Sequence, residues 1–111
     1  MQYFKTVFLE RASLFIRELD EKTYKKLLYT IENAEQSKDP RHFKKLNEYI
    51  WEFRLKYQKM QIRLLAFWDK TDREKTLVVV THGFIKKSSK VPISKIEQAL
   101  VLRDLYFDIK K

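Results

Sequence analysis

A switch to a strict two-residue period, at residues 51–57, constrains the fold of this chain more than any other feature. Four large apolar side chains in this segment alternate with three charged ones, Glu52, Arg54 and Lys56. Successive side chains of a β-strand point to opposite faces of a sheet, so the pattern predicts a strand with one apolar and one charged face. The rest of the chain must supply a layer that covers the apolar face.

Two further segments are expected to form central strands of the same sheet. Residues 62–68 are apolar on both faces apart from Arg63, and residues 76–81 contain an uninterrupted apolar run. The polar connection between them, residues 69–74, is too short for a crossover helix. The two strands are therefore expected to pair antiparallel.

The residues before this segment predict a strand and a helical hairpin. Residues 3–9 are mostly aromatic or apolar and suit a first strand. Apolar residues then recur at helical spacing on both sides of Asp20, which suits the N-cap of a second helix. The hairpin is expected to end at Asp39-Pro40, because the residue before a proline is disfavoured in helical backbone.

A last helix is predicted near the C-terminus. Pro92 precedes it, and Ser94 with Glu97 fits a capping box. Apolar residues at 101–109 surround this helix more completely than one packing face requires, so it is either deeply buried or docks in part on a partner. The only glycine, Gly83, falls where the preceding strand could kink or bulge.

These elements predict an α+β fold in a single domain spanning residues 1–111. The expected order is strand, two helices, three antiparallel strands and a helix, with the helices covering one face of the sheet. No internal repeat is visible in the sequence.

The charge and the residue composition limit the partners and the kinds of chemistry that are expected. The 24 Lys and Arg against 15 Asp and Glu give a net charge of +9, which favours nucleic acid as a partner. A solvated basic surface or an acidic protein partner would also account for this charge. The chain has no cysteine, which excludes disulfides and thiolate chemistry. With only two histidines as further nitrogen ligands, no metal is expected, and no cofactor is expected either. No segment resembles a signal peptide or a membrane span of ~20 apolar residues, so a cytoplasmic location without a membrane partner is expected.

Basic residues from three segments form the candidate site. If the sheet pairs as predicted, charged side chains converge near one open face: Glu52, Arg54, Lys56, Arg63, Lys86, Lys87 and Lys90. Arginine suits such a site because its planar guanidinium holds phosphate oxygens in a bidentate manner. The alternative is an ordinary solvated strand face with charge pairs such as Glu52 with Lys56.

Two histidines and one tyrosine are further candidates. His82 could act as an acid or a base because imidazole titrates near neutrality, but a hydrogen-bonded histidine at the end of a buried strand is the favoured interpretation. His42 is expected to be an ordinary surface residue. Most of the aromatic side chains are expected in the core, whereas Tyr49 is less constrained and could stack on an RNA base.

Three segments together resemble a known family. They are Trp51-Glu52-Phe53-Arg54, Ile62-Arg63-Leu64-Leu65, and His82-Gly83-Phe84-Ile85-Lys86-Lys87 followed by Pro92 and the closing helix. This combination is similar to the RelE/ParE toxin superfamily, and most similar to its HigB-like, phage-derived branch. The resemblance covers nearly the whole chain, because the preceding strand and helical hairpin also follow the family's order.

The resemblance implies a RelE-like fold and a toxin that cleaves messenger RNA, usually in the ribosomal decoding site. It also implies a tightly bound antitoxin, often a helix-turn-helix protein. Arg54 matches the arginine that closes the family's strand motif, and Arg63 matches the arginine that opens the next strand. Lys86 and Lys87 match the basic pair after the glycine, so these four residues are the expected catalytic site.

The sequence departs from the family's pattern at two positions. Glu52 falls where RelE has a lysine, and Tyr106 lies within an extra helix, whereas RelE uses a C-terminal tyrosine. The identity of the general acid and base therefore stays open.

The chemistry that the resemblance implies needs no metal. The 2′-hydroxyl of the RNA attacks the adjacent phosphate, and the protein orients the chain, transfers protons and stabilises negative charge. Arg54 and Arg63 are expected to bind that phosphate, and the remaining RNA contacts are expected from Lys56, Lys90 and Tyr49. Two alternatives stay open: a ParE-like toxin that inhibits DNA gyrase by protein contact, and a noncatalytic RNA-binding module.

Overall fold

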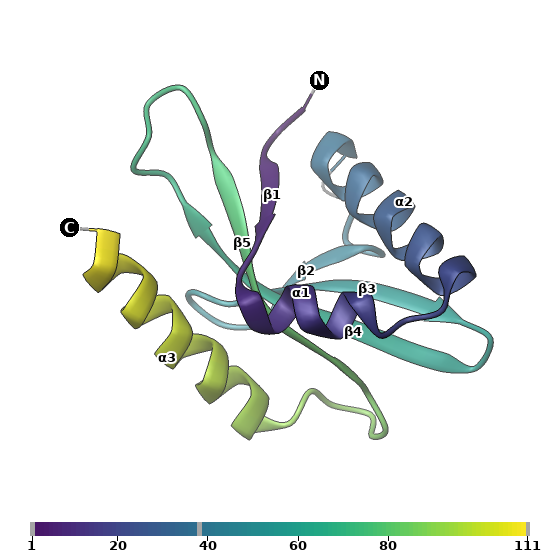
Figure 1. The fold of residues 1–111 in the computed structure, drawn as a ribbon. Coiled ribbons are helices and arrows are strands. Elements are labelled where there is room, and N and C mark those ends of the chain that lie inside the picture. Colours follow the sequence, from purple (N-terminus) through teal and green to yellow (C-terminus); the bar gives the residue numbers. More distant parts are fainter. Residues whose placement is uncertain (1, 38, 111) are drawn as a thin grey trace.

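The computed structural model describes residues 2–37 and 39–110, which form a five-stranded sheet and three helices (Figure 1). The elements are β1 (Lys5–Phe8), α1 (Glu10–Arg17), α2 (Glu21–Ser37), β2 (Phe43–Lys45), β3 (Trp51–Tyr57), β4 (Met60–Asp69), β5 (Leu77–Ile85) and α3 (Ile93–Lys110). The expected α+β fold class is confirmed. The short strand β2 is the one element that the sequence did not predict.

The strands lie in the order β1-β5-β4-β3-β2, and only the β1–β5 pair is parallel. Strands β4 and β5 are therefore central, which explains why both of their faces are apolar. Strand β2 pairs with the start of β3 at the edge of the sheet. Its three residues are too few to display a period, and only Phe43 among them is buried.

Helices cover both faces of the sheet. On one face, α1 and α2 pack on alternate residues of the central strands, including Leu64 and Val80. On the other face, α3 packs through Ala99 against a second set that includes Phe67 and Val79. In Figure 1, α3 accordingly lies on the side of the strands away from α2. The expectation of helices on one face only was wrong, because strands that are apolar on both faces need a cover on each.

The irregularity in β5 lies at Thr81 and not at Gly83. Leu65 pairs with His82 but Ala66 pairs with Val80, which leaves Thr81 as an extra residue. Gly83 pairs regularly with Leu64, so the expected kink or bulge at the glycine was wrong. A Cβ at Gly83 would lie 2.4 Å from Cδ2 of Phe15, so this position allows α1 to approach β5 closely.

The helix caps agree with expectation at α2 but not at α3. The backbone N–H of Thr23 donates to Oδ1 of Asp20 at 2.8 Å, which confirms the predicted N-cap. The N–H groups of Lys95 and Ile96 donate to the carbonyl of Pro92, so α3 begins before Ser94. The predicted capping box was wrong, because the carbonyl of Pro92 accepts the first helical hydrogen bonds and Ser94 therefore lies inside the helix.

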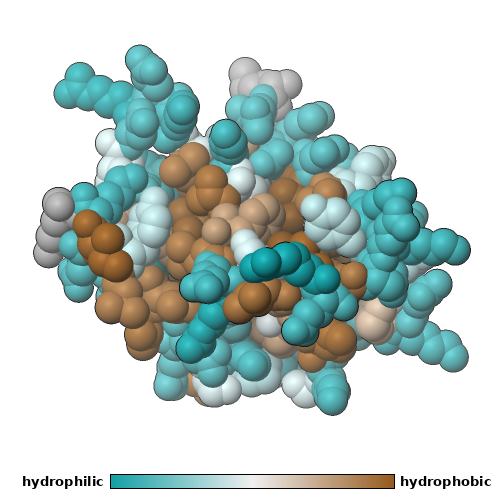
Figure 2. Space-filling model, in the orientation of Figure 1, coloured by the Kyte–Doolittle hydropathy of each residue, from teal (hydrophilic) through white to brown (hydrophobic). Residues whose placement is uncertain are grey.

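Helix α3 is only partly buried, which excludes the first of its two predicted settings. Four large apolar side chains remain exposed on it: Ile93, Val101, Leu105 and Ile109. Figure 2 shows apolar surface gathered over the end of this helix. Docking of this face on a partner stays a prediction. Among the described residues, no helix has both the length and the apolar character that a membrane span requires.

Candidate functional site

The pairing of β3 with β4 places two arginines side by side. Arg54 lies directly opposite Arg63, and its neighbours on the same face, Glu52 and Lys56, lie opposite Leu65 and Gln61. Helix α3 packs on this face near Leu65 and Phe67, farther along β4. The end of the face that carries the arginines is hollowed, and this arginine hollow has a volume of about 370 Å³. Its lining residues are Arg41, Arg54, Lys56, Gln61 and Arg63.

A buried carboxylate holds the two arginines together. Glu52 is 4% exposed and Arg63 is 3% exposed, and Oε2 of Glu52 lies 3.4 Å from Nε of Arg63. The other carboxylate oxygen, Oε1, lies 3.4 Å from Nε of Arg54. Burial raises the pKa of Glu52 and lowers that of Arg63, and the attraction between the two opposes both shifts. One carboxylate therefore orients two guanidinium groups, and the trio keeps a net positive charge.

The two guanidinium groups differ in exposure. The Arg54 side chain is 34% exposed, whereas that of Arg63 is 4% exposed. Arg63 donates from Nη1 to the carbonyl of Ile62 at 3.2 Å and from Nη2 to Oε1 of Gln61 at 3.0 Å. Arg54 is consequently the group that can reach a ligand directly, and Arg63 adds positive potential from below.

Lys86 belongs to the same electrostatic cluster. Its backbone N–H donates to the carbonyl of Gln61 at 2.7 Å, and its Nζ donates to the carbonyl of Ser89 at 3.2 Å. Burial lowers the pKa of Lys86, and Arg63 lowers it further. The other predicted loop residues, Lys87 and Lys90, are exposed and stand farther along the loop.

Two cationic residues of the site were missed by the sequence analysis. Lys44 pairs with Glu52 across the β2–β3 ladder and lowers the pKa of that carboxyl. Arg41 lines the arginine hollow, and its Nη2 donates to Oδ2 of Asp39 at 2.6 Å. That contact holds the pKa of Asp39 at about 2. Neither cation could be found by periodicity, because β2 is short and Arg41 lies in a loop.

The comparisons with known proteins show the family and the fold of this chain. Residues 14–104, most of the chain, match the family described as phage derived protein Gp49-like. This chain belongs to the Gp49-like family. That family consists of RelE/HigB-like toxins, so the expected membership in the RelE/ParE superfamily is confirmed.

A solved structure supports the fold of this Gp49-like protein. A chain from the crystal structure of the intact E. coli RelBE toxin-antitoxin complex aligns with a TM-score of 0.56 and 20% identity. The alignment covers 77% of the Gp49-like protein and 99% of that chain. No match was found among curated protein sequences.

His82 of the Gp49-like protein lies outside the arginine hollow. It is 5% exposed, its Nδ1 lies 3.0 Å from Oγ1 of Thr81, and Leu65 separates it from Glu52 across the sheet. Burial lowers the pKa of His82 to about 4, with Lys95 as a further cause. The position of His82 on a buried strand with a contact at Nδ1 fits the favoured interpretation, whereas its Nε2 is buried without a hydrogen-bond partner among the described residues. His42 is half-buried rather than an open surface residue, and its carbonyl accepts the backbone N–H of Arg54 at 2.8 Å.

Two tyrosines also lie away from Arg54 and Arg63. Tyr49 is 44% exposed but lines a different hollow, where Cζ of Arg103 lies 4.1 Å from its ring centroid. Tyr106 donates to Oδ2 of the buried Asp69 at 2.6 Å, at the end of β4 opposite to Arg63. Six residues of strand, roughly 20 Å, separate Asp69 from Arg63. Tyr106 therefore lies at the other end of β4 from the arginine hollow.

Among the residues that the structure describes, no group of three or more His, Asp or Glu side chains is arranged to hold a metal ion. The arginine hollow instead offers guanidinium and ammonium groups around one carboxylate. Such a set can bind a phosphate and stabilise added negative charge on it.

Proposed function

We propose that this Gp49-like protein is the toxin of a type II toxin-antitoxin pair and a metal-independent endoribonuclease that cleaves messenger RNA on the ribosome. The observation that carries the proposal is the pair of arginines held side by side by one buried carboxylate on an open end of the sheet. Guanidinium groups fixed in this way suit a phosphodiester on which negative charge develops.

In the proposed reaction, the 2′-oxygen of the RNA forms a bond to the adjacent phosphorus as the bond to the 5′-oxygen of the next nucleotide breaks. The products are a 2′,3′-cyclic phosphate and a 5′-hydroxyl end. Arg54 contacts the phosphate oxygens directly, while the buried Arg63 acts as a positioning residue. The 2′-hydroxyl releases its proton to water, Lys86, whose pKa is lowered, donates a proton to the departing 5′-oxygen, and Lys87 screens the charge on that oxygen.

Lys56 and Lys90 are assigned to the RNA backbone on either side of the reacting phosphate. Lys56 is exposed and lines the arginine hollow, and Lys90 is exposed on the loop that follows Lys86. Contacts of this kind add affinity that falls with salt concentration.

The test is Arg54→Ala, assayed for growth arrest on induction and for cleavage of messenger RNA in a translating extract. We expect both activities to fall by at least a hundredfold, since Arg54 is the exposed guanidinium of the pair. Arg54→Lys should recover only part, because an ammonium group cannot hold two phosphate oxygens in the same plane. Arg73→Ala, which removes an exposed arginine from the loop between β4 and β5, is the matched control.

Full cleavage by Arg54→Ala would remove this residue from the site. Intact RNA together with inhibited supercoiling by purified gyrase would favour the ParE-like alternative. Salt-sensitive RNA binding without any cleavage would favour the noncatalytic module.

We propose a helix-turn-helix antitoxin as the protein partner. The similarity to a chain of the RelBE complex and the net charge of +9 support a partner that binds tightly and carries acidic residues. Co-expression of a candidate helix-turn-helix antitoxin should relieve growth arrest, and the two proteins should purify together.

A further inference from the structure

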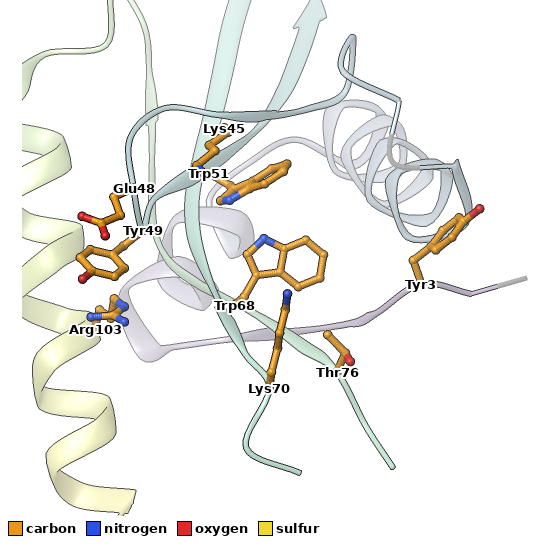
Figure 3. A pocket seen from close by; sticks show the side chains of 9 residues that line it. All are labelled: Tyr3, Lys45, Glu48, Tyr49, Trp51, Trp68, Lys70, Thr76 and Arg103. Atoms are coloured by element: carbon orange, nitrogen blue, oxygen red, sulfur yellow. The ribbon is translucent and has the colours of Figure 1, made fainter. Parts of the chain in front are cut away.

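A second hollow of the described surface is larger than the one that carries the arginine pair. It has a volume of about 650 Å³ and lies at the other end of β3 and β4 (Figure 3). We refer to it as the aromatic hollow, and the side chains that matter here are Lys45, Tyr49, Trp51, Trp68, Lys70 and Arg103. Nothing in the proposed cleavage step uses these residues.

Aromatic rings and cations are interleaved in the aromatic hollow. The rings of Trp51 and Trp68 meet edge to face, with centroids 5.6 Å apart and an interplanar angle of 81°. Nζ of Lys70 lies 5.1 Å from the ring centroid of Trp68. The Arg103 guanidinium covers one side of Tyr49, which still exposes 44% of its surface. Figure 3 shows the two indoles side by side, with Lys70 next to Trp68.

This combination fits single-stranded nucleic acid better than an acidic peptide. Every base has a flat face that can stack on an aromatic side chain, and lysines beside the rings can contact the phosphates between bases. Arg103 already has a carboxylate neighbour, since Oδ1 of Asp104 lies 3.8 Å from its Nη1, and the carboxylate of Glu48 also lines the hollow. The phosphate contacts are therefore assigned to the other two cations, Lys45 and Lys70.

The edge strand β2 connects the aromatic hollow with the arginine hollow. Lys44 pairs with Glu52 and so points to the arginine face, whereas Lys45 pairs with Trp51 and lines the aromatic hollow. Both lysines are exposed. Along β3, Trp51 and Arg54 are three residues apart, about 10 Å of strand. A short RNA segment that crosses the β2 edge can touch both sites.

We propose that the aromatic hollow is a second RNA subsite, which holds single-stranded nucleotides next to the segment that is cleaved. A base stacks on Tyr49, Lys45 and Lys70 contact the backbone, and the chain crosses β2 to reach Arg54. This inference rests on the proposed function for the identity of the ligand, but binding here is measurable without cleavage.

Intrinsic fluorescence reports on this subsite selectively, because the two tryptophans of the chain, Trp51 and Trp68, both line it. The probe is an eight-nucleotide oligouridine with 2′-O-methyl riboses, which cannot be cleaved by 2′-oxygen attack. We expect saturable quenching of tryptophan emission by this probe. Duplex RNA of equal length should quench little, because its bases are already stacked on one another.

Variants separate the subsite from general electrostatic attraction. Lys45→Ala/Lys70→Ala should weaken the affinity measured by quenching by roughly tenfold or more, whereas Lys22→Ala/Lys25→Ala, an equal loss of charge on α2, should change it little. Tyr49→Leu should weaken binding by about tenfold, and Tyr49→Phe should keep it, since only the ring is needed for stacking.

The outcomes are distinguishable from those of the cleavage test. Absence of quenching, equal quenching by duplex RNA, or quenching unaffected by Lys45→Ala/Lys70→Ala would each overturn the subsite. Quenching that depends on Lys45 and Lys70 in a protein that cleaves no RNA would support the subsite and reject the nuclease. Quenching that is retained in Arg54→Ala while cleavage is lost supports both proposals.

Discussion

At the scale of single residues, Glu52 is the centre of the candidate site. Among the described residues, it is the carboxylate that forms ion pairs with both arginines, and it is as buried as Arg63. Removing one member of a buried ion pair leaves an uncompensated charge, which usually costs about 3–5 kcal/mol. Replacing both members by apolar residues often restores stability, because neither charge then needs to be desolvated.

We therefore expect Glu52→Leu to destabilise the protein by about 3 kcal/mol, and Glu52→Leu/Arg63→Leu to recover most of that loss. The double variant should nevertheless cleave RNA poorly, because Arg54 loses its orienting carboxylate. Urea unfolding gives the stabilities, and a cleavage assay gives the activity. A double variant that is as unstable as the single one would show that the charges themselves do not set the cost.

His82 is expected to make the stability of the protein depend on pH. The folded protein holds the pKa of His82 near 4, below its ordinary value of 6.5, mainly through burial. As the pH falls below 6.5, the unfolded chain binds a proton that the folded chain does not, so the free energy of unfolding should fall until about pH 4. The loss from this group should be about 3 kcal/mol at most.

In His82→Gln, which cannot take up a proton, the stability should change less between pH 6.5 and pH 4 than in the unaltered protein. Denaturant titrations at a series of pH values check this. If the free energy of unfolding changed equally with pH in the two proteins, His82 would not contribute to the pH dependence of stability, which would contradict the prediction.

At the scale of elements, α3 is attached to the sheet by polar contacts at its end. Tyr106 and Lys110 donate to the same oxygen of Asp69, at 2.6 Å and 2.7 Å. Burial opposes ionisation of this carboxyl, but the hydrogen bonds from Lys110, Tyr106 and Thr71 outweigh it and hold the pKa of Asp69 far below its usual value. The ionised carboxylate therefore stabilises the docked helix at neutral pH.

Asp69→Asn should loosen the last turns of α3, because an amide is a weaker acceptor for the Lys110 ammonium. The stability that Asp69 contributes is present above about pH 4 and declines as the pH falls further, so the variant should be less stable than the unaltered protein at pH 7 and closer to it at pH 3. Hydrogen exchange of the α3 amides measures the loosening. Unchanged protection of α3 in the variant at pH 7 would contradict this account of how the helix is held.

At the scale of the whole molecule, the strong periodic segments were sufficient to predict the fold class, the antiparallel β3–β4–β5 core and the helical hairpin. The alternation at 51–57 also indicated correctly that Glu52, Arg54 and Lys56 share one face. The sequence was less informative about what each face meets. An apolar residue on β4 shows that its face is covered, but not whether α1, α2 or α3 covers it.

The candidate site was predictable in part for the same reason. Arg54 and Arg63 stand on strands whose register follows from a short hairpin, so their adjacency could be anticipated. The burial of Arg63 against Glu52 could not, because the alternation of apolar and charged residues does not show how deeply a charged side chain is buried. Arg41 and Lys44 were missed since the chain around them is too short to show a pattern.

The aromatic hollow is also a property of the whole fold. Its lining comes from segments as distant as Lys45 and Arg103, which only the sheet order and the position of α3 bring together. Under the proposed function, the aromatic hollow and the arginine hollow would contact the same RNA strand on either side of β2.

The most direct test of the proposed nuclease activity is cleavage of a defined RNA on the ribosome, with the product ends identified by mass spectrometry. The purified protein is incubated with ribosomes programmed with that RNA, once unmodified and once with a single 2′-O-methyl group at the cleavage position. We expect a 2′,3′-cyclic phosphate and a 5′-hydroxyl end from the unmodified RNA, and no cut at the methylated position. Cleavage at the methylated position, or no cleavage of either RNA by a folded protein, would contradict the proposed activity.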